Sequence, residues 1–117
     1  MTAFYPGRPP IDAYGSGGFR FAGMSHRGSI LLLPSGIYAW NEQDFAPVLA
    51  ERDAVDLLLL GTGRDMVRPP RSVRDSFERS GIQLDFMATA FALSTYNLLL
   101  AEGRKVAAAL TAVAETG

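Results

Sequence analysis

One loop of the sequence combines residue types that could bind an anion. Gly61, Thr62 and Gly63 follow an apolar run, and Arg64 and Arg68 come shortly after them. The two glycines would let backbone N–H groups approach a ligand, and arginine supplies planar donors for a carboxylate or a phosphate. The loop lacks the lysine of a P-loop and the third glycine of a dinucleotide fingerprint. One hypothesis is a small anionic ligand at this loop; the alternative is a tight turn followed by a solvated arginine face.

A second set of polar residues lies within a long uncharged stretch, residues 86–101. Thr95 and Asn97 could face a pocket beside the glycine loop and bind the same ligand. Alternatively, they hydrogen-bond to neighbouring backbone, because buried polar groups need partners. The stretch is apolar on more than one side of a predicted helix, and a sheet covers only one side. We therefore expect a loop, a second copy of the chain or another protein to cover the rest.

The sequence offers no convincing catalytic or metal-binding set. Cysteine is absent and His26 is the only histidine, which argues against thiolate sites, multi-histidine zinc sites and a Ser-His-Asp triad. Asp85 and Glu102 bracket one predicted helix, so they would lie about 25 Å apart, too far for an acid–base pair. We predict no catalytic residue, no metal and no cofactor.

The charge balance argues against nucleic-acid and membrane partners. The chain has 11 basic and 12 acidic residues and a net charge of −1, which gives no overall field to attract nucleic acid or anionic lipid. The uncharged stretch is too short and too polar to span a bilayer. The first ten residues resemble neither a secretion signal nor a transit peptide. We expect a cytoplasmic protein that binds no nucleic acid and does not insert into a membrane.

The elements that position these residues fit one domain, since 117 residues are about one domain's length. Residues 1–18 are rich in proline and glycine and predict an irregular N-terminal segment, whereas residues 19–117 predict a single domain. Its first part predicts an antiparallel meander of three strands, with a turn at residues 25–28, and then a helix that begins near Asn41. The strands of the meander are expected at residues 19–22, 29–33 and 37–40.

The second part predicts a β-α-β-α-β series. Ser72 and Asp75 have the spacing of a capping box for the first helix, which Gly81 would end, and Asp85 would cap the second. The final segment is rich in alanine, which favours a helix, but its position after the series favours a strand. A mixed central sheet with flanking helices, an α/β fold, accommodates both parts. The expected elements are strands at 55–60, 82–84 and 106–113 and helices at 72–80 and 86–102.

Several short motifs, taken together and in order, resemble one known family. They are Gly17-Gly18-Phe19, residues 28–36 with Trp40, and residues 58–63, 81–82, 87–89, 95–97 and 102–110. This set resembles the small Mth-type domain family of unknown function. That family includes mitochondrial complex I (NADH dehydrogenase) assembly factor 3 and the adipogenesis-associated Mth-type domain-containing protein. The resemblance covers residues 11–110.

The resemblance implies a three-layer α/β domain with a final strand and no established enzymatic activity for bacterial members. It also implies an assembly role like that of the mitochondrial relative in building respiratory complex I. Members commonly carry arginine immediately before Thr-Tyr-Asn, where this chain has Ser94. If that arginine binds an anion, the role is missing here or passes to Arg64 or Arg68.

The leading functional hypothesis is a non-enzymatic protein-interaction module, an assembly factor for a respiratory or membrane complex. Its partner would be another protein or a second copy of the chain. The alternative is a small-molecule or anion-binding protein that uses the Gly61-Thr62-Gly63 loop.

Overall fold

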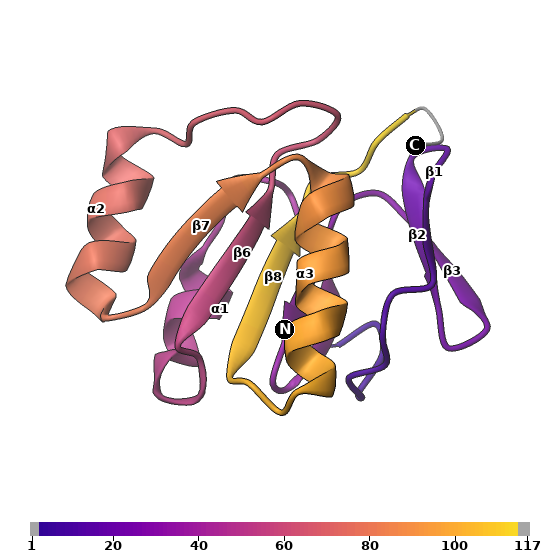
Figure 1. Cartoon of the computed structure of the whole chain (residues 1–117), viewed down its shortest axis with the longest axis horizontal. Helices are drawn as coiled ribbons and strands as arrows, with labels where there is room; N and C mark the ends of the chain where they lie inside the picture. The colour runs from indigo at the N-terminus through magenta and orange to yellow at the C-terminus, as the bar shows by residue number, and fades with distance from the viewer. Residues whose placement is uncertain (1–2, 115–117) are drawn as a thin grey trace.

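Two β-sheets organise the chain in the computed structural model, which describes residues 3–114 (Figure 1). The larger sheet has five strands in the order β5-β4-β8-β6-β7. Strand β6 pairs in parallel with β7 and β8, whereas β4 pairs antiparallel with β5 and β8. The sheet is therefore mixed, as the sequence predicted. Its strands are β4 (Ile30–Leu33), β5 (Gly36–Ala39), β6 (Leu57–Gly61), β7 (Gln83–Met87) and β8 (Val106–Leu110).

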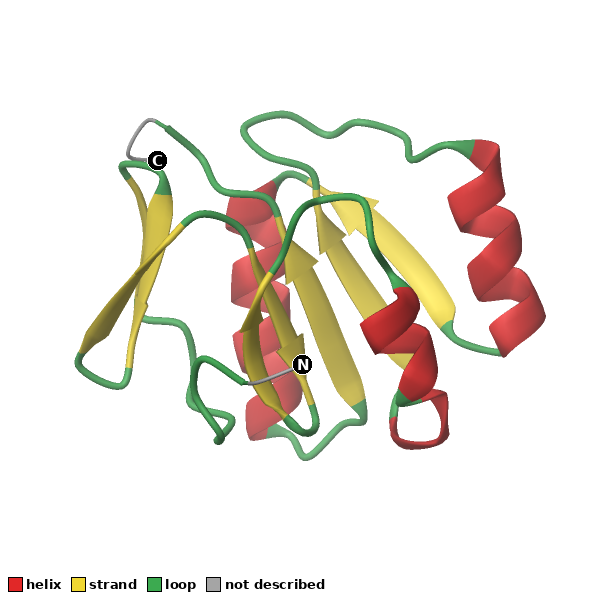
Figure 2. Cartoon of the chain, turned by 180° about the vertical axis from the view of Figure 1, so that it is seen from behind, coloured by secondary structure: helices red, strands yellow, loops and turns green. Residues whose placement is uncertain are grey.

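Helices cover both faces of this sheet (Figures 1 and 2). The helix α3 (Thr89–Ala101) lies on one face, and α2 (Arg71–Ser80) and the short α1 (Ala46–Ala50) lie on the other. A 3-10 turn, Arg52–Ala54, follows α1. Each face has its own cluster of buried apolar side chains. The three-layer α/β architecture is thereby confirmed.

Strand β8 is the central strand of the large sheet, and all five of its residues are buried. Ala108 belongs to the cluster on the α3 side, and Ala107 and Ala109 belong to the cluster on the α2 side. Small side chains on both faces let the two helical layers approach the sheet, and strand pairing on both edges outweighs the helix preference of alanine. The predicted final strand is confirmed for residues 106–110.

The smaller sheet consists of three antiparallel strands at one end of the molecule (Figure 1). They are β1 (Ala13–Gly15), β2 (Gly18–Phe21) and β3 (Met24–Arg27). Two-residue turns join them, and φ is positive at both residues of each turn: 53° and 79° at Ser16 and Gly17, 51° and 74° at Ala22 and Gly23. Such turns match the twist of a hairpin.

This sheet differs from the predicted meander. The first predicted strand pairs within the small sheet and not with residues 29–33, and the predicted turn at residues 25–28 includes most of β3. The N-terminal segment, irregular in the prediction, contains β1 and the buried Ile11. The cause is local: β3 has the sequence Met-Ser-His-Arg, which lacks the apolar alternation of a half-buried strand.

The predicted caps were wrong at three helices. Pro70, and not Ser72, precedes the first helical residue of α2, without a side-chain cap. Asp85 lies inside β7, because the parallel pairing of β7 with β6 continues to Met87. Asn41 accepts hydrogen bonds from the N–H groups of the second and third residues after it in an isolated turn, and α1 starts only at Ala46.

Candidate functional site

The glycine loop lies at the carboxyl end of β6, where its backbone groups are already hydrogen-bonded. The N–H of Thr62 donates to the carbonyl of Met87 at 2.8 Å, and the N–H of Gly63 donates to the hydroxyl of Thr89 at 2.9 Å. A Cβ at Gly61 would lie 2.9 Å from that hydroxyl, and Gly63 has a φ of +97°. Close packing and a left-handed conformation therefore account for both glycines, without a ligand.

Thr89 joins three loops at this edge of the sheet. Its hydroxyl accepts from Gly63 and donates to the carbonyl of Thr111 at 2.8 Å, and the side chain is fully buried. The N–H of Thr111 in turn donates to Gly61. The chain segments that follow β6 and β8 are thus fixed to the start of α3. Sequence reasoning missed Thr89 as a site residue, because its partners are 22 and 26 residues away.

A pocket of about 390 Å³ lies beside this loop on the α2 side of the sheet. Thr62 and Arg68 are among the residues that line it, and Glu42 is its acidic residue. Open α/β sheets commonly hold ligands outside the carboxyl ends of their strands. The rest of the lining is mostly apolar and comprises Trp40, Gln43, Phe45, Leu60, Val67, Pro69, Pro70, Val73 and Thr111.

The structure does not bring Asn97 to this pocket. Asn97 lies eight residues beyond Thr89, about 12 Å further along α3. Its amide oxygen accepts from the N–H of Ile11 at 2.9 Å, and its amide nitrogen donates to the carbonyl of Ile11 at 2.8 Å. Thr95 is half-buried two residues before Asn97 in α3, and Arg64 lies outside the pocket lining. Of the predicted site residues, Thr62 and Arg68 share the pocket.

Tyr96 fixes the N-terminal segment against α3. Its side chain is 1% exposed, and a guanidinium nitrogen of Arg8 lies 3.5 Å from its hydroxyl and also donates to the carbonyl of Val106. Burial raises the pKa of Tyr96 above its ordinary value, and the charge and hydrogen bond of Arg8 offset part of that rise. A loop thus covers one side of α3, as the sequence analysis expected.

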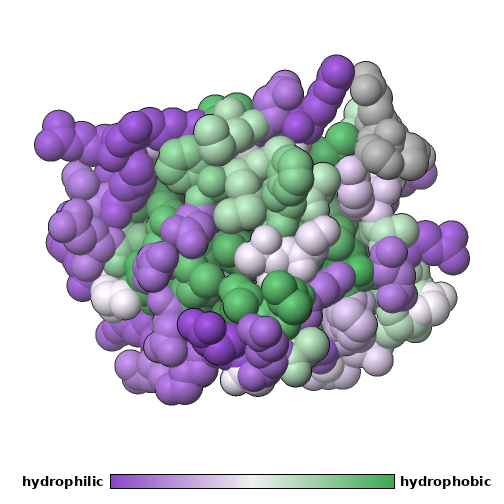
Figure 3. Space-filling model, viewed as in Figure 1, coloured by the Kyte–Doolittle hydropathy of each residue, from purple (hydrophilic) through white to green (hydrophobic). Residues whose placement is uncertain are grey.

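The outward side of α3 remains uncovered. Phe91 is 69% exposed and Leu98, two turns later, is 59% exposed. No residue of the helix is charged. The half-buried Met87 and Leu99 contribute further apolar surface to the same side of the sheet. Figure 3 shows hydrophobic surface over α3 and the neighbouring strands; we call the surface of Phe91, Leu98, Met87 and Leu99 the α3 face.

Residues 3–114 contain no group of three His, Asp or Glu side chains that could hold a metal ion. None of the helices in that range is long and apolar enough to cross a bilayer.

The arrangement of the two sheets and the helices defines a Mth938-like domain. The chain belongs to the family of proteins of unknown function DUF498/DUF598, whose model matches residues 11–111. The motif resemblance is thereby confirmed.

Three relatives illustrate the family. A crystal structure described as an outer membrane protein from Bartonella henselae is 50% identical, with a TM-score of 0.90, and the match covers 93% of this chain and 98% of that chain. An uncharacterized protein of Rhodobacter capsulatus is 42% identical over 91% of this chain and 86% of its own length. The mouse NADH dehydrogenase (ubiquinone) 1 alpha subcomplex assembly factor 3 is 30% identical over 94% of this chain, which spans 64% of that protein.

Proposed function

We propose that the chain is a non-enzymatic interaction module that assists the assembly of a respiratory membrane complex and binds its partner through the α3 face. The exposed Phe91 and Leu98 on an uncharged helix are the observation that carries this proposal. The assembly factors among its relatives supply the kind of complex, a respiratory NADH dehydrogenase.

The α3 face suits a protein partner because the fold does not use it. The inward side of α3 already buries Ala92, Leu93 and Tyr96. Aromatic side chains that stand on the surface are typical anchors of interfaces, and full burial of Phe91 would contribute about 1.5–3 kcal/mol. Met87 and Leu99 extend the apolar surface around Phe91 and Leu98, so a partner can exclude water from a larger apolar area there. Asp85, half-buried two residues before Met87, is the nearby charge that such a partner would have to leave at the rim or pair.

A deletion strain of the host tests the proposal. Native gels of its membranes should show less of the complete NADH-oxidising complex and more of its partly assembled forms. The wild-type gene should restore the complex, whereas the double variant Phe91→Glu, Leu98→Glu should not. The control Met24→Glu, at an exposed apolar residue of the small sheet, should restore it fully. Normal complex in the deletion strain, or full restoration by the double variant, would rule the proposal out.

The melting temperature of each purified variant keeps this test interpretable. Both exposed positions tolerate polar residues without loss of buried contacts, so the double variant should melt near the wild-type temperature.

A second candidate function is favoured by the pocket beside the glycine loop. We propose that it binds a small molecule with an apolar body and one acidic group, which Arg68 would pair with at the rim. A ligand at a hundredfold excess over its Kd adds about 2.7 kcal/mol to stability, which a thermal-shift screen of organic acids detects. Arg68→Ala should abolish the shift, and Arg79→Ala on α2 should not. A screen without any shift would remove this candidate.

A further inference from the structure

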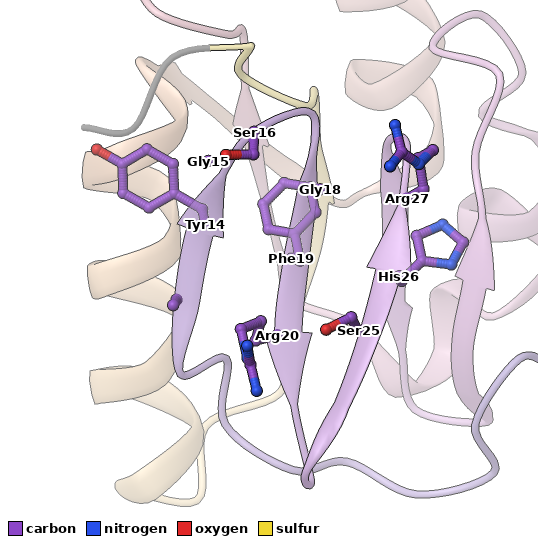
Figure 4. A pocket seen from close by; sticks show the side chains of 10 residues that line it. Tyr14, Gly15, Ser16, Gly18, Phe19, Arg20, Ser25, His26 and Arg27 are labelled. Carbon is purple, nitrogen blue, oxygen red and sulfur yellow. The ribbon is translucent and has the colours of Figure 1, made fainter.

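We propose that the outer face of the small sheet binds a phosphate group between Arg20 and Arg27, which share that face above a hollow of about 500 Å³ (Figure 4). This site is separate from the α3 face and from the pocket beside the glycine loop. All three strands of the small sheet and the turn at Ser16 line the hollow.

The strand register places three donor side chains together. Arg20 of β2 pairs directly with Ser25 of β3, so these two side chains emerge on the same face of the sheet. Arg27 follows Ser25 by two residues and therefore lies on that face as well. Arg20 and Arg27 are diagonal neighbours across the strand pair, a relation that places two residues about 7–8 Å apart. Figure 4 shows Ser25 and Arg27 along β3 and Arg20 on the neighbouring β2.

The neighbouring positions on this face carry almost no side chain. Gly18 pairs with Arg27, and Gly15 pairs with Gly18. A Cβ at Gly18 would lie 2.2 Å from the carbonyl oxygen of His26, so no larger residue fits there without a shift of the strand. The backbone of β3 therefore fills the space beside Gly18, and the room for a ligand is the neighbouring hollow that Arg20, Ser25 and Arg27 line.

The charge in the hollow is positive and unbalanced. The lining contains Arg20 and Arg27 but no Asp or Glu. Within residues 3–114, the guanidinium groups of Arg20 and Arg27 have no hydrogen-bond or ion-pair partner, and the hydroxyl of Ser25 has no hydrogen-bond partner. Phe19, on the opposite face of β2, is buried in the core and fixes the strand that carries Arg20. Two donors on a rigid sheet thus face solvent without a partner in the described chain.

A phosphate is the anion that fits this arrangement best. Guanidinium groups offer forked N–H donors that match phosphate oxygens, and two of them balance a dianion. Both side chains are long, so from a diagonal of that length their guanidinium groups can reach a ligand held between them in the hollow. The same chemistry could be supplied by a dissolved phosphate compound or by a lipid headgroup, and phosphate in solution and lipid vesicles distinguish these two sources.

The first arm of the experiment uses inorganic phosphate and the whole chain. Amide signals of β1–β3 in ¹⁵N NMR spectra should shift saturably, with a Kd of about 1 mM, in about 0.15 M NaCl, where distant charges are screened. Arg20→Gln and Arg27→Gln should each weaken binding about tenfold or more. Arg79→Gln, at an exposed arginine of α2, should leave the affinity unchanged. Because neither arginine has a described partner, the variants should keep the wild-type melting temperature.

Other ions and vesicles complete the test. Acetate at the same concentration should shift these amides much less than phosphate. If phosphatidylcholine vesicles that contain phosphatidylglycerol produce the shift and both glutamine variants abolish it, the phosphate belongs to a lipid; if only the dissolved ion does, it belongs to a soluble compound. Absence of a saturable shift with either probe, equal shifts with acetate, or an equal loss in the Arg79→Gln control would overturn the proposal.

Discussion

The two long helices both cover the large sheet, but the sides that they turn to solvent differ: one is charged and the other is apolar. Helices α2 and α3 each connect parallel strands of the large sheet, and they lie on opposite faces of it. Helix α2 anchors itself chiefly through the buried Phe77 and turns a charged side to solvent. Helix α3 buries four residues on its inner side but presents Phe91 and Leu98 outward. The charged residues of α2 are Arg71, Arg74, Asp75, Glu78 and Arg79.

The contrast separates what folding requires from what it does not. A helix on a sheet needs one apolar side, and α2 shows that this sequence can place charge on the other. The apolar outward side of α3 therefore contributes little to folding. Exposed apolar surface of this kind commonly marks an interaction site. The inward sides of the helices should accordingly control stability, and the outward side of α3 should control association.

Phe77→Ala should cause the largest loss of stability. The substitution leaves a cavity between α2 and the sheet, which costs about 3–5 kcal/mol for a buried phenylalanine. Urea denaturation followed by circular dichroism measures the loss. Leu98→Ala on the exposed side of α3 is the matched control and should stay within about 0.5 kcal/mol of the wild type. Equal losses in the two variants would contradict the contrast between the helices.

Asn97→Ala should have the next largest effect, because it removes the two hydrogen bonds that hold Ile11 against α3. Buried backbone groups left without a partner cost about 1–3 kcal/mol. Ser94→Ala is the control: its hydroxyl is exposed and bonds only to the carbonyl of Ala90 within the same helix. A loss in Asn97→Ala no greater than in the control would show that the N-terminal segment does not depend on this amide.

Tyr96, on the side of α3 that covers the sheet, should make the free energy of unfolding decrease at alkaline pH. Burial raises the pKa of Tyr96 in the folded chain above its ordinary value of 10.0, so the unfolded chain loses this proton first. The stability contribution is complete below pH 10.0 and is lost as pH rises through the folded-state pKa, by at most about 1.4 kcal/mol per pH unit. Urea denaturation between these limits should show a shallower decline in Tyr96→Phe. An identical slope in both proteins would exclude Tyr96 as the cause.

The large sheet could be predicted from the sequence because its strands are local patterns. The apolar runs that became β4 and β6 are short and bounded by turn residues, and Gly81 ends α2 in a left-handed conformation as predicted. The small sheet could not be predicted. Its strand β3 is polar, and both of its hairpin turns begin with a residue other than glycine at positive φ, Ser16 and Ala22.

The candidate sites divide in the same way. The position of Gly61-Thr62-Gly63 after a buried strand was predictable, whereas the role of Thr89 depends on contacts across 22 and 26 residues. The Arg20–Arg27 pair depends on the register between β2 and β3, which the assignment of residues 25–28 to a turn concealed. The residue types thus indicated which ligands could bind, but only the pairing of the strands showed which side chains lie close together.

The smallest stability effect should come from charging the outward side of α3. In the double variant Phe91→Lys, Leu98→Lys, both side chains stay in water and no buried contact is lost, so unfolding free energy should change by about 0.5 kcal/mol or less. Its solubility in ammonium sulfate should rise, because an exposed apolar surface promotes self-association. Glu78→Lys, Asp75→Lys on α2 is the matched control and should raise solubility much less, since that side is already charged. A loss of more than about 1 kcal/mol in the α3 variant would mean that its apolar side supports the fold itself, and the division of labour between the two helices would fail.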